Sequence, residues 1–172
     1  MFKTISIILF LVCFMILSGC STVLKNTSDL ANIAVANDQV MSGQVAETIK
    51  SVNLSSTESL IVDHAINQYS GFVDKWKSSI NYLDSSEPLF TEFVADYRKI
   101  VAQYRAVKEQ VVKPHWSEYT ETNRALLNEY HGRVDRIDQS VNGLIDAGNR
   151  HQALLDALYL GQVLAGIAGN LL

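Results

Sequence analysis

The stretch that decides the fold is FTEFVADYRKIVAQYRAVKEQV, residues 90–111. Its large apolar residues recur at alternating steps of three and four: Phe90, Phe93, Tyr97, Ile100, Tyr104, Val107 and Val111. This spacing places all of them on one stripe of an α-helix and matches the seven-residue period of a coiled-coil-like seam. The segment therefore predicts a long amphipathic helix whose aromatic stripe faces other helices.

Two further helices are predicted on the amino-terminal side. The first covers about residues 29–52, with Ser28 at its N-cap position. The second covers about residues 56–83 and begins at a capping box, in which Ser55 and Glu58 each bind a backbone N–H of the other residue. Apolar residues at helical spacing mark the inward face of this second helix: Ile61, Ala65, Phe72, Trp76, Ile80 and Leu83.

Two prolines bear on the ends of the helix that contains residues 90–111. Residues 84–88, DSSEP, combine N-cap residues with Pro88, which fits the first turn of a helix. Pro114 should disturb the helix, because proline lacks an N–H and clashes with the preceding turn. Residues 108–116 nevertheless contain no Gly, Asn, Asp or Ser with which to build a chain reversal.

The apolar stripe resumes beyond Pro114. Its members are Trp116, Tyr119, Leu126, Tyr130, Val134, Ile137, Val141 and Leu144. We therefore expect one long helix from Glu87 to Ala147, kinked at Pro114, in preference to a hairpin of two helices. At a rise of ~1.5 Å per residue it would be about 90 Å long.

The last predicted helix is unusually apolar. Residues 146–152, DAGNRHQ, supply a glycine C-cap and an Asn149-x-x-Gln152 restart, and residues 157–172 contain no charged side chain. If only one face of this helix docks, many of its leucines remain exposed: Leu158, Leu160, Leu164 and Leu171. A contiguous exposed apolar surface of more than a few hundred Å² usually marks an interaction site.

A ridge of small residues lies on the same helix. Ala157, Gly161, Ala165 and Gly169 recur every fourth residue, which permits close helix contact. We expect Gly161, Ala165 and Gly169 to mediate association with a protein partner or a second copy. Plain docking on the bundle and insertion into a membrane are the alternatives, although sixteen residues rise only about 24 Å against a hydrocarbon core of ~30 Å.

These patterns together predict an all-α protein. Only two prolines occur, and alternating Val/Ile/Thr runs typical of strands are absent. We expect an elongated antiparallel helical bundle over residues 28–149, followed by the apolar carboxy-terminal helix at 150–172.

The amino terminus carries a targeting signal rather than part of the fold. Lys3 precedes an uncharged apolar run from Ile5 to Leu17, which is shorter than the ~20 residues of a membrane-spanning helix. The run ends in Leu17-Ser18-Gly19-Cys20. These four residues resemble the lipobox of bacterial lipoprotein precursors.

The resemblance implies how the chain is processed and anchored. A lipoprotein precursor is cleaved between the residues that correspond to Gly19 and Cys20, and Cys20 receives diacylglycerol on its thiol and an acyl chain on its new amino group. Residues 1–19 would then be a cleaved signal peptide and residues 20–27 a lipidated tether. In enteric-type lipoproteins, Asp after the cysteine retains the protein in the inner membrane, so Ser21 implies export to the outer membrane.

Composition narrows the remaining possibilities. Cleavage removes Lys3 from the 14 basic residues, which leaves 13 against 18 acidic residues and a net charge of −5. This acidic balance favours neither nucleic acid nor anionic lipid headgroups as a partner. If the chain is processed as the resemblance implies, Cys13 is lost with the signal and Cys20 carries lipid, so no disulfide is expected. The domain must be stabilised by its apolar core.

The sequence shows no catalytic or metal-binding motif. None of the four histidines is preceded by Glu at the Glu-x-x-His spacing of bundle metal sites, and no nucleotide-binding or nucleophile-elbow motif occurs. We expect no catalytic residues, no metal and no cofactor beyond the covalent lipid on Cys20. The tyrosines and tryptophans lie at helical spacing, which favours core packing over a ligand platform.

The expected function is therefore a non-enzymatic interaction or scaffold protein, held by its lipid on the periplasmic face of the outer membrane. The alternative is a membrane-active or membrane-bridging lipoprotein, similar to phage single-chain spanins or of an exclusion type. A cell-wall enzyme would require a cleft that gathers carboxylates, and a lipid chaperone would require an apolar cavity.

Overall fold

The computed structural model describes residues 43–166, which belong to one compact unit of residues 38–172. Secondary structure in this part of the chain is helical and includes no strand. The helices are residues 43–49, α2 (Ser56–Trp76), α3 (Ile80–Leu83), α4 (Glu87–Val107), the π-helical turn η1 (Lys108–Val112), α5 (Glu121–Asp146) and α6 (Arg150–Ala165). The predicted all-α class is confirmed.

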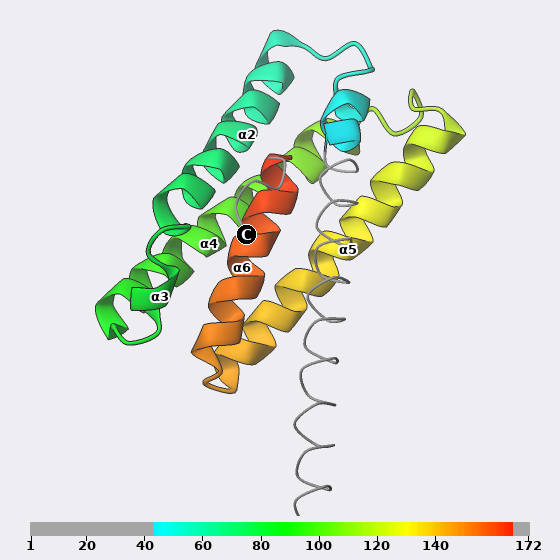
Figure 1. Cartoon of the computed structure of the whole chain (residues 1–172). Helices are drawn as coiled ribbons and strands as arrows, with labels where there is room; N and C mark the ends of the chain where they lie inside the picture. Colours follow the sequence, from blue (N-terminus) through cyan, green and yellow to red (C-terminus); the bar gives the residue numbers. More distant parts are fainter. Residues whose placement is uncertain (1–42, 167–172) are drawn as a thin grey trace, which may run out of the picture. The chain divides into compact units, whose positions relative to one another are not determined.

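Helix α6 lies at the centre of the helix packing. It packs against α5 on one side and against α2 on the other, and α2 packs in turn against α4 (Figure 1). Within residues 43–166, no helix is both long enough and apolar enough to cross a membrane.

The seven-residue stripe of α4 and η1 is buried as predicted, from Phe90 to Val111. Its aromatic rings meet those of α2: the Phe93 ring centroid lies 5.3 Å from that of Phe72 and 5.4 Å from that of Trp76. Offset and edge-on ring pairs of this kind stabilise the interface beyond the area they bury. The stripe thus joins α4 to the core of the bundle.

Local signals fixed several helix ends. The capping box at α2 is confirmed: Ser55 N donates to Glu58 Oε2 over 2.8 Å, and Glu58 N donates to Ser55 Oγ over 3.3 Å. Pro88 lies in the first turn of α4, and Gly148 has φ +73° after the end of α5. The predicted restart is confirmed, because Asn149 is the N-cap residue of α6, but the Asn149 side chain makes no capping hydrogen bond and Gln152 donates to Asp156 over 2.6 Å.

The predicted helix at 56–83 is interrupted. Helix α2 ends at Trp76, residues 77–79 form a turn, and α3 adds one short turn of helix that ends at Leu83. Ser78 and Ser79 occupy the break, where serine side chains compete with helical backbone hydrogen bonds. The predicted inward residues Ala65, Phe72, Trp76 and Leu83 are buried and Ile61 is partly buried; the Ile80 side chain lies outside the description.

The expectation of one long helix kinked at Pro114 is wrong. The helix ends at Val112, residues 113–120 turn, and α5 runs back along α4. Residues far apart in sequence meet across this hairpin: Tyr97 Oη donates to Asp138 Oδ1 over 2.7 Å, and Tyr104 Oη lies 2.6 Å from His131 Nδ1.

The chain reverses without glycine because contacts with other parts of the chain hold the turn. The Tyr119 hydroxyl donates to the carbonyl of Ile49 over 3.3 Å, and His115 bonds to Glu58 at the start of α2. Thr120 then caps α5, its hydroxyl oxygen accepting from Asn123 N over 3.2 Å. Thr120 is the local signal that indicates a restart, and it lies beyond residues 108–116, which contain no reversal residue.

Helix α6 is buried on more than one face. Leu158, Leu160 and Leu164 are 7%, 0% and 5% exposed, so the expectation that docking would leave them on the surface is wrong. Two neighbouring helices, α2 and α5, cover them instead of one. A Cβ atom added at Gly161 would lie 2.7 Å from Phe72 Cδ1, which shows that this glycine permits close approach of α6 to α2 of its own chain.

Candidate functional site

Of the residues singled out in the sequence, Gly161 and Ala165 lie in the described part of the chain. Gly19, Cys20 and Gly169 lie outside the described residues. Gly161 is buried against Phe72, and Ala165 is half-buried at the end of α6. The association role of this small-residue ridge stays a prediction, but Gly161 has an intramolecular packing role that accounts for the absence of a side chain.

Two polar clusters are buried between α4 and α5 instead. The first surrounds Asp138, which is 7% exposed. Its carboxylate accepts hydrogen bonds from Tyr97 Oη over 2.7 Å, Arg105 Nη2 over 2.8 Å and Asn142 Nδ2 over 3.1 Å. Three donors satisfy the buried carboxylate, so this cluster holds the two helices together without offering a free group.

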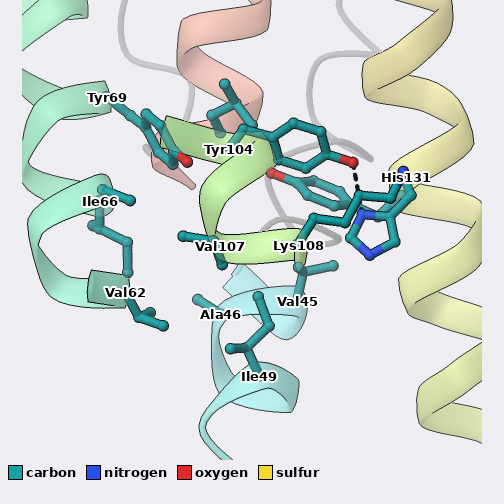
Figure 2. Close-up of a pocket in the computed structure, with 13 residues that line it drawn as sticks. Val45, Ala46, Ile49, Val62, Ile66, Tyr69, Tyr104, Val107, Lys108 and His131 are labelled. Atoms are coloured by element: carbon teal, nitrogen blue, oxygen red, sulfur yellow. Dashed lines mark hydrogen bonds between the residues drawn. The ribbon is translucent and has the colours of Figure 1, made fainter. Parts of the chain in front are cut away.

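The second cluster is the pair of Tyr104 and His131. Tyr104 Oη lies 2.6 Å from His131 Nδ1, and both side chains are buried (Figure 2). Tyr104 has no other acceptor among residues 43–166, so we assign the hydroxyl proton to this bond and the imidazole proton to Nε2. Burial, reinforced by the nearby Lys108 ammonium, lowers the pKa of His131 to about 4 and keeps the ring neutral at pH 7.

The outer edge of the His131 ring is unsatisfied. Nε2 is buried and has no hydrogen-bond partner within residues 43–166. A buried donor without an acceptor costs about 1–3 kcal/mol. Because native proteins rarely retain such groups, His131 is the strongest pointer to a functional role in the described part of the chain.

Two hollows adjoin this ring. A small apolar cavity of about 40 Å³ lies between residues 45–49, α2, α4 and α5, and Tyr69, Tyr104 and His131 are among its lining residues (Figure 2). A cavity of this size can hold about one water molecule and is far too small for a lipid chain. This cavity could not hold the acyl chain that a lipid chaperone binds.

The second hollow is an open groove of about 300 Å³, which we call the 108–131 groove. Its lining residues are Lys108, Glu109, Val112, Lys113, Trp116, Asn128 and His131. Most of them come from η1 and the turn after it, where Lys113 N donates to the carbonyl of Lys108 over 3.0 Å in the wider π-helical pattern. π-Helical turns are rare and often occur at functional sites.

One wall of the groove is fixed by a histidine between two carboxylates. His115 Nε2 lies 2.9 Å from Glu58 Oε1 and its Nδ1 lies 2.7 Å from Glu118 Oε1. The hydrogen bond to Glu118, followed by the one to Glu58, raises the pKa of His115. The pKa of Glu58 is lowered to about 2, mainly by its hydrogen bonds with Ser55. The His115–Glu58 pair thus fastens the 113–120 turn, which carries Trp116, to the start of α2.

Sequence reasoning missed His131 and Asp138 as inward residues. The signal was present in a second stripe on α5, since Leu127, His131, Val134, Asp138 and Val141 alternate steps of four and three. The polar members of a stripe with this period are masked when only apolar residues are followed. No protein-family model, curated protein or solved structure matches this chain.

Proposed function

We propose that this chain is an outer-membrane lipoprotein whose helical domain acts as a non-enzymatic interaction protein on the periplasmic face. The observation that carries the proposal is the complete lipobox Leu17-Ser18-Gly19-Cys20 followed by Ser21. Two acyl chains already hold a protein stably on a bilayer at ~0.8 kcal/mol per buried CH₂. The anchor is the lipid, so the proposal requires no membrane-spanning helix.

The packing of α6 bears on the rival proposal of a membrane-bridging protein. Insertion of residues 157–172 would first withdraw Leu158, Leu160 and Leu164 from the core. Removing three buried leucines costs several kcal/mol each by the scale of core truncations. This cost favours a domain that stays folded and meets its partner through its surface.

Large apolar side chains are available on that surface. Leu60 on α2 and Tyr82 on α3 are each 69% exposed. Isolated exposed apolar residues are common in proteins. Leu60 and Tyr82 therefore serve as positions at which a partner contact can be tested.

The first prediction concerns lipidation and uses cells fed an alkyne fatty acid. The wild-type chain and Cys13→Ala should incorporate the label and fractionate with the outer membrane, because Cys13 lies within the cleaved signal. Cys20→Ala should lose the label and accumulate as the longer precursor. Labelling of Cys20→Ala, or an unlabelled soluble wild-type product, would contradict the proposal.

The same cells test the interaction role. A photo-crosslinking residue at position 60 or 82 should give a discrete adduct with one envelope protein or a second copy, whereas position 139, an exposed polar site on α5, serves as the control. Crosslinks to lipid alone would favour the membrane-active alternative.

A further inference from the structure

We propose that the 108–131 groove binds a small organic carboxylate with an apolar or aromatic body. This site is independent of the lipid anchor and of the proposed function. The groove combines an unsatisfied buried donor, cationic side chains and an aromatic ring, and its walls come from η1, the 113–120 turn and α5.

The first element of recognition is the His131 Nε2–H. His131 is 8% exposed, and its Nδ1 is occupied by Tyr104, so the opposite edge of the ring has a donor with no acceptor in residues 43–166. A carboxylate oxygen is a strong acceptor for such a donor. The Lys108 side chain extends beside the ring (Figure 2), and Lys108 and His131 both line the groove.

The second element is the charge of the groove. Lys108 Nζ lies 3.3 Å from Asp135 Oδ2, which is longer than the 2.7–2.9 Å typical of a strong charge-assisted bond. Its remaining N–H groups are available to an anion. The one carboxylate among the lining residues, Glu109, is paired with Lys113 over 2.8 Å, so its charge is largely neutralised toward a ligand.

The third element is apolar. Trp116 and Val112 line the groove beside the charged residues, and the Trp116 ring is held edge-on to Tyr119 with 6.4 Å between centroids. A volume of about 300 Å³ is at the lower end of small-molecule sites. The groove therefore fits a molecule of about the size of one amino acid, with its carboxylate toward His131 and Lys108 and its body on Trp116.

The test uses the purified full chain in neutral detergent micelles and three matched probes at pH 7. Phenylacetate should bind saturably with a dissociation constant of about 1 mM and shift the Trp116 indole and His131 ring NMR signals. Phenylacetamide, which has the same shape without the charge, and phenethylamine, a cation, should bind at least about tenfold more weakly. Empty micelles give the correction for partition of the probes.

Variants assign the binding to the groove. Lys108→Gln should weaken phenylacetate binding about fivefold or more, and the paired change Tyr104→Phe with His131→Leu should weaken it about tenfold while the core loses both members of one hydrogen bond. Lys99→Gln, an exposed lysine of α4 paired with Asp96, is the control and should bind as the wild type does. Circular dichroism checks that each variant is folded.

Three outcomes would overturn the inference. The first is equal affinity for phenylacetate and phenylacetamide. The second is wild-type affinity in both the Lys108→Gln variant and the Tyr104→Phe, His131→Leu variant when both are folded. The third is absence of saturation up to the solubility of phenylacetate.

Discussion

Two tyrosines of α4, seven residues apart, each bind a polar residue of α5, and these two α5 residues are also seven apart. The two tyrosine pairs differ in whether all the hydrogen-bonding groups of the α5 residue are satisfied. Tyr97 donates to Asp138, whose carboxylate is also bound by Arg105 and Asn142. Tyr104 pairs with His131, whose second nitrogen is bound by no residue in the described part of the chain.

The difference shows how one helical register can serve two purposes. Both pairs fix α5 against α4 at the same point of the repeat, because seven residues return to the same helix face. The Asp138 cluster is complete and contributes stability, whereas the His131 pair is left one hydrogen bond short beside a groove. The incomplete pair is where binding is expected.

The largest effect is expected from breaking the complete cluster. Asp138→Ala should lower the free energy of unfolding by about 3 kcal/mol, since it leaves Tyr97 without its acceptor and removes the partner of Arg105. Urea unfolding followed by circular dichroism measures the loss. Asp135→Ala, on the same helix with a half-exposed pair to Lys108, should cost less than about 1 kcal/mol. Equal losses in the two variants would show that the Asp138 cluster has no special role.

An intermediate effect is expected from pH. The pKa of His131 is about 4 in the folded protein against 6.5 in the unfolded chain, so the unfolded chain binds an extra proton between these values. This contribution is complete above pH 6.5 and is lost as pH falls toward 4, by about 2–3 kcal/mol at about 1.36 kcal/mol per pH unit. Unfolding midpoints across this range should fall less in the Tyr104→Phe, His131→Leu double variant than in the wild type.

A matched variant separates His131 from the other paired histidine. The raised pKa of His115 has the opposite sign, because its contribution is complete below pH 6.5 and is lost as pH rises through the raised value. His115→Gln should therefore flatten the alkaline side of the stability profile, while the loss that His131 causes between pH 6.5 and about 4 remains. An acid side that is the same in the His131 variant and the wild type would contradict the assignment.

The smallest effect is expected from removing the incomplete pair at pH 7. Tyr104→Phe combined with His131→Leu should change the free energy of unfolding by less than about 1 kcal/mol, since replacing both partners by apolar groups leaves no orphan. The matched double variant Tyr97→Phe with Asp138→Leu should still cost about 2 kcal/mol, because Arg105 and Asn142 lose their acceptor. A larger loss at the His131 pair would show that this pair is structural as well.

Much of the helical structure could be predicted from residues that are close together in the sequence. The alternation of three and four residues from Phe90 to Val111 predicted a buried stripe, and the capping box of Ser55 and Glu58 predicted the start of α2. These predictions succeed because spacing and capping depend on residues within a turn or two of one another. The resemblance of residues 17–20 to a lipobox also rests on adjacent residues, and the lipid anchor stays a proposal.

Tertiary structure alone decided the rest. The reversal at 113–120 has no glycine and depends on Glu58 and the carbonyl of Ile49, which are distant in sequence. Burial of α6 depends on having α2 on one side and α5 on the other, which the apolar composition of α6 could not specify. The 108–131 groove follows from the reversal, because His131 reaches η1 only after the chain has turned back. Periodicity determines which face of a helix is apolar, but the free energy of packing selects the neighbours that cover it.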